Sequence, residues 1–380
     1  MSTTDIATGR LPTIEQLDVI EVCVPRTQRN RIRTTYGTLP DAHFALVHIQ
    51  AEGLEGAGEA STDHWWTGED AVTVRHVIET YLAPLVKGER LGIRDAAERM
   101  KKAIEGHPHA RAAIETALWD VLGKAVGLPL HALLGRADAR PLRIKYVIGL
   151  VEPEYARQEA EYAHDRGINY LKIKVGGDLE DDLRRVEAVA DVLGGRGNLG
   201  VDAQSGWSFA TTISALAPLE ALGVAFLEQP VARDYPEQMA EITRRSTIPI
   251  VAHESLFSLR DAMEAAHHGI GHIWALTPQT HGGVTPTLEL LSVARASGRS
   301  CLLGSTVELG VGTALVAQLG VAFDEFSDCP VPSDVIGPLY HEDDVVVEQP
   351  QIIDGYVHVP PGPGLGVSLD WERIKRYRVK

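Results

Sequence analysis

The sequence predicts an α/β protein in which a (β/α) barrel is joined to an α+β capping domain. After residue 140, short apolar runs alternate with helix-like stretches, whereas before it two long strand-like runs precede a helical region. A chain of 380 residues is long enough for a barrel with an attached cap. Its 44% of hydrophobic and 23% of charged residues are the ordinary balance of a globular protein.

The N-terminal third is predicted to be α+β. The runs QLDVIEVCVP (16–25) and HFALVHIQAEG (43–53) have the apolar, β-branched character of strands, and an arginine-bearing loop separates them. From residue 70 to about 134 the period becomes helical. It is clearest at 109–130, where Gly127 and Pro129 end an amphipathic helix.

Strand-like runs then recur along the chain: RIKYVIGL, YLKIKV, NLGVDA, VAFLEQP, IPIVAHES, HIWALTP and SCLLGST. Helix-like stretches such as 180–194 and 260–269 separate most of them, which is typical of a parallel sheet, and seven or eight such units favour a barrel. A doubly wound open sheet is the alternative, but no glycine-rich phosphate turn follows the first strand. We therefore expect a cap at 1–138, a barrel at 139–336 and a tail at 337–380, mostly strand and loop, that completes the cap.

Composition excludes several classes of partner. The formal net charge of −16 would repel nucleic acid and anionic membrane surfaces. The three cysteines (Cys23, Cys301 and Cys329) are odd in number and far apart, which favours a reducing setting. The N-terminus has no basic and apolar leader, and no apolar run reaches the roughly 18 residues of a membrane helix. We expect a soluble, cytoplasmic protein.

Charged and hydroxyl side chains follow the predicted barrel strands, at the ends where the reactive residues of barrels lie. They are Lys172 and Lys174, Asp202, Glu228, His253 with Glu254, Thr277, and Ser305 and Thr306 with Glu308. Successive steps from Lys174 through Asp202, Glu228 and His253 to Thr277 are 28, 26, 25 and 24 residues. Each step is about one βα unit, so we expect these side chains to converge at one mouth.

The acids at these strand ends indicate a metal site. Each of Asp202, Glu228 and Glu254 taken alone could be a solvated loop acid or a helix N-cap. Three acids gathered without a cation would repel one another, and some would have to be protonated. An oxygen-preferring dication such as Mg²⁺ removes that repulsion.

Lys172 and Lys174 are two residues apart, so on a strand both point to the same side. If that side is the barrel interior, the two ammonium groups, close to each other and to a dication, lower each other's pKa, and a lysine of this kind can act as a general base at neutral pH. An outward-facing solvated pair is the alternative. A lysine that faces a metal suits removal of a proton α to a carboxylate.

Several segments resemble the muconate-lactonizing-enzyme subgroup of the enolase superfamily (mandelate racemase/muconate cycloisomerase-like), over nearly the whole chain. They are KIKVGG, VDAQSGWS, FLEQPV, VAHES, THGGVT and VPPGPGLGVSLD. The resemblance implies a modified TIM barrel under a cap, Mg²⁺ on three strand-end carboxylates, a small carboxylate substrate and a homo-oligomer. It assigns Lys174 as the acid/base, Lys172 as its electrostatic partner, Asp202 and Glu228 as metal ligands, and Glu308 as a substrate-side acid.

The chain departs from this subgroup at His253, where the family has the aspartate of an ADES-like motif. Either His253 or Glu254 then completes the metal site. A histidine ligand would suit Mn²⁺, Fe²⁺ or Zn²⁺ better than Mg²⁺. The alternatives are that His253 faces the substrate, or that the site has degraded and binds metal weakly or not at all.

The second departure is Thr277, where the subgroup has a second catalytic lysine. A racemase needs a base on each side of the substrate, and threonine cannot be one at neutral pH. One-sided chemistry, either cycloisomerisation or syn dehydration, is therefore favoured over racemisation unless His253 or His281 replaces the lysine. A non-catalytic binding relative is the remaining alternative. The resemblance implies substrate contacts from the cap loops, here at Arg31, Arg33, Tyr36 and Trp65; surface arginines and a buried Trp65–Trp66 pair are the alternative.

Overall fold

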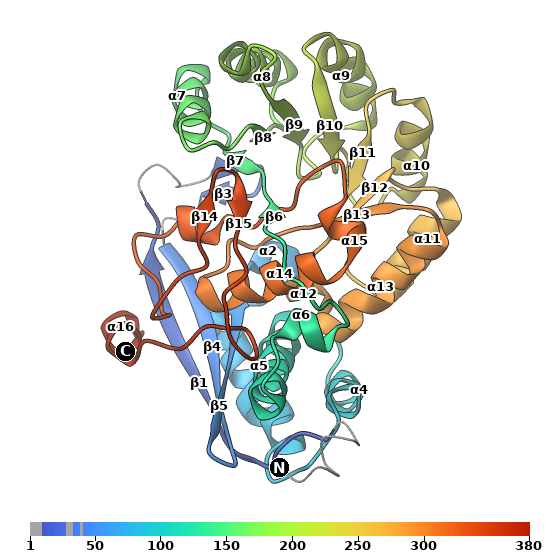
Figure 1. Ribbon diagram of the computed structural model, residues 1–380. Coiled ribbons are helices and arrows are strands. Elements are labelled where there is room, and N and C mark those ends of the chain that lie inside the picture. The colour runs from blue at the N-terminus through green and yellow to red at the C-terminus, as the bar shows by residue number, and fades with distance from the viewer. Residues whose placement is uncertain (1–9, 28–32, 39–40) are drawn as a thin grey trace.

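The computed structural model describes residues 10–27, 33–38 and 41–380, and it joins an antiparallel cap to a parallel barrel (Figure 1). The cap sheet has the order β1-β4-β5, and the loop that carries the hairpin strands β2 and β3 lies between β1 and β4. The strand bounds are β1 (Ile14–Pro25), β2 (Arg33–Thr34), β3 (Gly37–Thr38), β4 (Asp41–Ala51) and β5 (Leu54–Ser61). Both strand-like runs predicted in the N-terminal third are thus confirmed.

The helices of the N-terminal third are α2 (His64–Thr67), α3 (Ala71–Val77), the π-helical turn η2 (Ile78–Leu82), η3 (Ala83–Leu85), α4 (Ile93–Ala103), α5 (Pro108–Val126) and α6 (Leu130–Leu133). Of these, α3 and α5 pack directly on the cap sheet. The α5 helix lies directly on β5 because β5 has glycine where the two backbones meet. A Cβ atom at Gly58 would lie 1.9 Å from the carbonyl oxygen of Ala113.

The barrel sheet has seven parallel strands in the order β13-β12-β11-β10-β9-β8-β7, which confirms the predicted βα alternation. The strand bounds are β7 (Tyr146–Ile148), β8 (Tyr170–Lys174), β9 (Asn198–Asp202), β10 (Val224–Glu228), β11 (Ile250–Ala252), β12 (Ile273–Leu276) and β13 (Ser300–Leu303). The short strand β6 (Leu142–Arg143) precedes them and belongs to another sheet. The helices are α7 (Pro153–His164), α8 (Leu179–Leu193), α9 (Phe209–Ala221), α10 (Pro236–Arg245), α11 (Leu259–His268), α12 (Pro278–His281), α13 (Val284–Ala296), α14 (Gly310–Ala322) and α15 (Asp324–Ser327).

An irregular segment at 331–334 closes the barrel between its first and last strands. On one side, the backbone N–H of Lys145 donates to the carbonyl of Ser333 over 3.1 Å. On the other side, the backbone N–H of Asp334 donates to the carbonyl of Leu303 over 2.8 Å. The segment therefore takes the place of an eighth strand and brings Asp334 to the barrel mouth.

The tail differs from the strand-and-loop prediction by one helix. After η4 (Gly337–Leu339), the short strands β14 (Ile352–Ile353) and β15 (Tyr356–Val357) pair with β6 at the start of the barrel. The chain then returns to the cap as α16 (Trp371–Tyr377), beside β1 in Figure 1. The Asp370 side chain begins this helix by accepting hydrogen bonds from the N–H groups of residues 372 and 373. The domain boundaries at 138 and 336 stay predictions.

Buried acids of the cap accept hydrogen bonds from the first turns of barrel helices. Glu59, at the end of β5, accepts from the N–H groups of Leu309 and Gly312 over 2.7 and 2.8 Å at the start of α14. Glu115 of α5 accepts from the N–H of Thr285 over 2.9 Å at the start of α13. The first N–H groups of a helix have no partner within it, so these carboxyls join cap and barrel. None of the helices in the described ranges is both long and apolar enough to cross a bilayer.

We predict that replacing Glu115 with glutamine makes the protein less sensitive to alkaline pH. Burial raises the pKa of Glu115 from 4.5 to about 7. Between pH 4.5 and about 7 the folded state keeps a proton on Glu115 that the unfolded state has released. The free energy of unfolding therefore falls as pH rises through this range, and the loss is complete above about pH 7. Between pH 5 and 8 the wild type should lose ~1–3 kcal/mol more unfolding free energy than Glu115→Gln.

Melting temperatures at pH 5 and 8 test this expectation. The exposed Glu289 of α13 provides the matched control, because Glu289→Gln should follow the wild type at both pH values. The prediction would be contradicted if the melting temperatures of the wild type and Glu115→Gln differed by the same amount at pH 5 and at pH 8.

Candidate functional site

Strand register brings the predicted site residues to one level at the barrel mouth. Lys174, the last residue of β8, pairs with Asp202 at the end of β9, and Asp202 pairs with Glu228 at the end of β10. His253 and Glu254 follow the end of β11 directly. All five residues are buried, with at most 8% of their surface exposed. The convergence expected from the spacing is therefore present.

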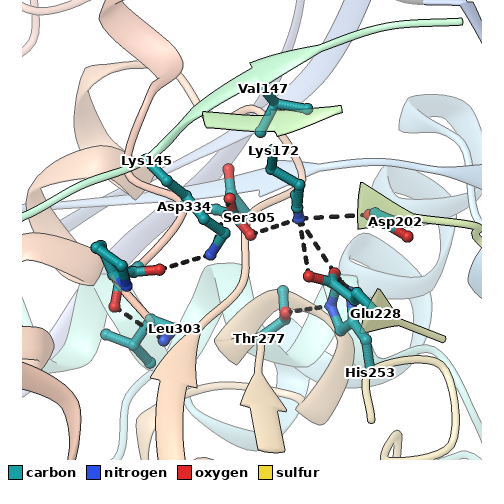
Figure 2. A network of polar contacts seen from close by, with 12 residues as sticks. Lys145, Val147, Lys172, Asp202, Glu228, His253, Thr277, Leu303, Ser305 and Asp334 are labelled. Carbon is teal, nitrogen blue, oxygen red and sulfur yellow. Dashed lines mark hydrogen bonds and ion pairs between the residues drawn. The ribbon is translucent and has the colours of Figure 1, made fainter. Parts of the chain in front are cut away.

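Lys172 contacts three acids from different parts of the barrel, Asp202, Glu228 and Asp334 (Figure 2). Its Nζ is 3.1 Å from each carboxylate oxygen of Glu228, 3.3 Å from Asp202 Oδ2 and 2.9 Å from Asp334 Oδ2. Burial opposes the charge, but these three acids raise the pKa of Lys172 well above its ordinary value. The lowered pKa is expected for a lysine pair beside a dication, whereas here the carboxylates face Lys172 directly and raise its pKa.

Lys174 has a different environment from Lys172. Its Nζ is 2.6 Å from Asp202 Oδ2, and its side chain lines the cavity at the barrel mouth. Burial disfavours an ionised Asp202, yet Lys174 and Lys172 hold the pKa of that carboxyl well below its usual range. Lys174 thus combines one close carboxylate partner with access to a substrate.

Protein groups engage both ring nitrogens of His253. Nδ1 lies 3.1 Å from Glu228 Oε1, and Nε2 lies 2.9 Å from Thr277 Oγ1 (Figure 2). The ring of Trp66 contacts the imidazole edge to face, with the centroids 4.9 Å apart. Burial opposes a charged ring, but the hydrogen bond and negative charge of Glu228 raise the pKa of His253. Both nitrogens of the ring are therefore already hydrogen-bonded to protein groups.

Glu254 is the acid that lacks a partner. Both of its carboxylate oxygens are buried and neither has a hydrogen-bond partner among the described residues. Burial is the main cause that raises the pKa of Glu254 to about 7. The charge of His253 opposes this rise, and the negative charge of Asp202 adds to it. A buried carboxylate without partners is costly, and a cation would remove that cost.

The donor set at the mouth fits an oxygen-preferring dication, although the side chains are not yet arranged around one. Within the described ranges, no three acid, imidazole or thiol side chains already surround a common point. Asp202 and Glu228 instead face the ammonium of Lys172. A dication beside Glu254 would compete with the lysine for these two carboxylates, and three carboxylates are a set of ligands suited to Mg²⁺.

A cavity at the barrel mouth contains residues from the cap and from the barrel. Its walls include Arg26, Thr62, Asp63, Trp65, Trp66, Val147, Lys172, Lys174, Gln204, His253, Ser305, Thr306, Val307, Asp334 and Ile336. Arg26, Trp66 and Asp334 were not among the site residues predicted from the sequence. Asp334 follows the proline-containing run CPVPS, which is unlike a strand, so its place in the barrel had no periodic signal.

The predicted substrate residues are only partly brought together. Trp65 lines the cavity, and Tyr36 stacks on it with the ring centroids 6.2 Å apart. Tyr36 itself faces an adjoining cavity that Glu254 also lines. Arg33 lies in β2 and is not among the residues that line the barrel mouth. Arg31 lies outside the described residues.

Glu308 does not face the cavity. One carboxylate oxygen accepts hydrogen bonds from the N–H and hydroxyl of Thr306 over 3.0 and 3.1 Å, and the other accepts from the Ser305 hydroxyl. Glu308 therefore orders its own loop, while Asp334 is an acid that lines the cavity. His281 is also placed away from it, with its ring nitrogens 3.1 Å from Thr287 Oγ1 and 2.8 Å from the carbonyl oxygen of Leu256.

Both halves of the chain match known domain families. Residues 16–135 match the mandelate racemase/muconate lactonizing enzyme N-terminal domain, and residues 154–373 match the enolase C-terminal domain-like family. A chloromuconate cycloisomerase of Pseudomonas putida is 33% identical over 370 residues, which cover 96% of this chain and 98% of that protein.

Two solved structures extend the comparison. The muconate lactonizing enzyme of Pseudomonas fluorescens in complex with muconolactone has a TM-score of 0.93 at 28% identity, covering 97% of this chain and 100% of that one. The L-Ala-D/L-Glu epimerase of Bacillus subtilis in a substrate-liganded complex has a TM-score of 0.89 at 27% identity, covering 93% and 98%.

We predict that Gly304→Ala disturbs the His253–Thr277 pair. A Cβ atom at Gly304 would lie 2.3 Å from Thr277 Oγ1 and 2.8 Å from His253 Nε2, so both side chains would have to move. The expected loss of unfolding free energy is about 1–3 kcal/mol, as for other overpacked sites. Thermal unfolding measures it.

A second substitution tests the cause. Thr277→Ala removes the hydroxyl that the new methyl group would meet, so the double variant should lose less stability than the sum of the two single variants. Additive losses would show that Gly304→Ala acts elsewhere.

Proposed function

Because the chain belongs to the mandelate racemase/muconate lactonizing enzyme family of the enolase superfamily, we propose that it is a cycloisomerase acting on an unsaturated dicarboxylate of the muconate class. The chain is an enolase-superfamily enzyme, and its relatives include muconate and chloromuconate cycloisomerases. The reaction would interconvert the open dicarboxylate and its lactone.

The one-sided placement of lysines is the observation that carries this proposal. Lys172 and Lys174 approach from β8, whereas Thr277 stands at the end of β12 and is bonded to His253. Cycloisomerisation moves one proton to or from one face of one carbon, so a single amine is sufficient. An epimerase must exchange protons on two faces, and threonine cannot serve the second face.

Lys174 supplies the proton in the lactonising direction. An oxygen of the distal carboxylate forms a C–O bond with an alkene carbon, and the electrons of the double bond move toward the carbon beside the other carboxylate. The resulting enediolate takes a proton from the Lys174 ammonium at that carbon. In the reverse direction the Lys174 amine removes the same proton while the ring C–O bond breaks, so no other reactant is consumed. Lys172 keeps its proton in this scheme, because Asp334 Oδ2, at 2.9 Å, stays its carboxylate partner when Asp202 and Glu228 hold the cation.

The family is metal-dependent, and in this proposal Asp202, Glu228 and Glu254 hold Mg²⁺. When bound, the cation would withdraw negative charge from the carboxylate next to the reacting carbon. Glu254 is preferred to His253 as the third ligand because its oxygens lack partners, whereas both imidazole nitrogens already contact protein groups. His253 then orients Glu228 and occupies part of the space beside Thr277.

Syn dehydration is also one-sided and is the second candidate reaction. It shares the Lys174 step but needs a leaving hydroxyl on the β-carbon of the substrate. The cycloisomerase relatives, which match this chain over nearly its full length, favour lactone formation.

We predict that the protein with Mg²⁺ converts cis,cis-muconate or a chloro derivative to a lactone. In D₂O the lactone should carry one deuterium in a single configuration at the carbon beside the free carboxylate, because only Lys174 delivers it. Loss of the conjugated-diene absorbance measures the rate, and nuclear magnetic resonance locates the deuterium.

Two variants accompany this assay. Lys174→Ala should lower the rate by about 10²- to 10⁴-fold, the usual contribution of a positioned acid or base. Lys101→Ala, which changes an exposed lysine of the cap helix α4, should leave the rate unchanged. Full activity of Lys174→Ala, or deuterium in both configurations, would refute the mechanism.

We also predict that Glu254, and not His253, is needed for the metal. Mg²⁺ at 100 times its dissociation constant should stabilise the wild type by about 2.7 kcal/mol, because it binds only the folded state. Glu254→Gln should abolish the Mg²⁺-dependent rise in melting temperature, and His253→Gln should retain most of it. The opposite pattern would make His253 the ligand.

A further inference from the structure

Lys145 is a fully buried lysine that the proposed chemistry does not use. Its side chain has no exposed surface and lies between β6 and β7, behind the wall of the cavity rather than in it. Burying an ammonium is costly unless partners compensate. Its position therefore requires an explanation in terms of those partners.

The partners of Lys145 are all on the segment that closes the barrel or beside it. Nζ donates to the carbonyl of Pro332 over 2.5 Å and forms an ion pair with Asp334 Oδ1 over 3.2 Å. It also lies 5.8 Å from the ring centroid of Phe226. Figure 2 shows Lys145 and Lys172 on opposite sides of Asp334.

Asp334 connects the two lysines. Its Oδ1 faces Lys145, while its Oδ2 accepts a hydrogen bond from Lys172 over 2.9 Å. The other acids around Lys172 are Asp202 and Glu228, the two that we propose as metal ligands. Asp334 is thus the acid of Lys172 that stays available to it when a cation occupies the mouth.

We propose that Lys145 is a positioning residue, which fixes the Asp334 carboxylate and through it holds Lys172 at the substrate side of the metal site. This inference rests on the proposed function, because it assigns Lys145 a part in that reaction. Without Lys145, Asp334 can rotate about its side chain and Lys172 follows the remaining acids toward the barrel axis. A displacement of about 1 Å in such a group can cost about 10²-fold in rate.

A purely structural role would have a different signature. If Lys145 only joined 331–334 to the barrel, its loss would lower stability and leave the folded enzyme with unchanged kinetics. Removing one partner of a buried ion pair is strongly destabilising in either case, so the kinetics of the folded variant are what separate the two roles.

The test compares Lys145→Met with a matched control, Lys124→Met. Lys124 forms a comparable pair with Asp120, at 2.7 Å, but in α5 of the cap. Steady-state kinetics with muconate and Mg²⁺ should show kcat reduced about 10- to 100-fold in Lys145→Met with KM changed less than about threefold, and neither altered in Lys124→Met. Retention of kcat by Lys145→Met would overturn the proposal.

A double variant tests the route through Asp334. If Lys145 acts only through this carboxylate, Lys145→Met should add nothing to the kcat loss of Asp334→Asn. Multiplying losses would overturn the proposed route. If Lys145→Met does not fold, the shorter Lys145→Gln carries the same expectation, and failure of both variants to fold would make Lys145 a structural residue and end the proposal.

A crystallographic readout keeps this inference separate from the proposed function. A wild type that does not convert muconate would refute the function alone. The structures of wild type and Lys145→Met with Mg²⁺ would still decide the inference, since the distance of 2.9 Å between Lys172 Nζ and Asp334 Oδ2 should lengthen beyond hydrogen-bond reach in the variant. An unchanged distance would refute positioning.

Discussion

The buried pairing of Lys172 with three acids is the interaction on which the rest of the site depends. Asp202, Glu228 and Asp334 come from three different parts of the barrel wall, and each contacts the same ammonium. Such a group is stable only while every charge keeps a partner, because a single unpaired ion in this interior is costly. The backbone register of β8, β9 and β10 and the closing segment must therefore all be correct together.

The cap is fixed to this cluster through other buried carboxyls. Glu59 and Glu115 accept hydrogen bonds from the first turns of α14 and α13, and Trp66 of α2 contacts the ring of His253. The helices that surround the last barrel strands are thus joined to the element that covers the mouth. This arrangement lets cap residues form one wall of a cavity whose reactive groups belong to the barrel.

Much of this architecture was predictable because it is periodic. The βα alternation and the nearly constant spacing of strand-end residues predicted the barrel and the convergence of Lys174, Asp202 and Glu228. Asp334, Lys145 and Trp66 carried no such signal. Asp334 stands in an irregular, proline-containing segment. Most lysines are solvated, and nothing in the local sequence marks Lys145 as buried, so only its tertiary contacts distinguish it. The Glu308 carboxylate points away from the cavity because it accepts hydrogen bonds from Ser305 and Thr306, and sequence spacing does not predict such local contacts.

The segment 331–334 also has a consequence for the order of folding. Pro332 is 187 residues from its partner Lys145 along the chain. Asp334 is 162 residues from its partner Lys172. Closing loops of that length is entropically costly and slow, so the barrel seam should form late. Until it does, both lysines lack the aspartate that compensates them. A nascent chain that has not yet emerged past residue 334 therefore has an open barrel and no competent site, and catalytic competence coincides with completion of the fold.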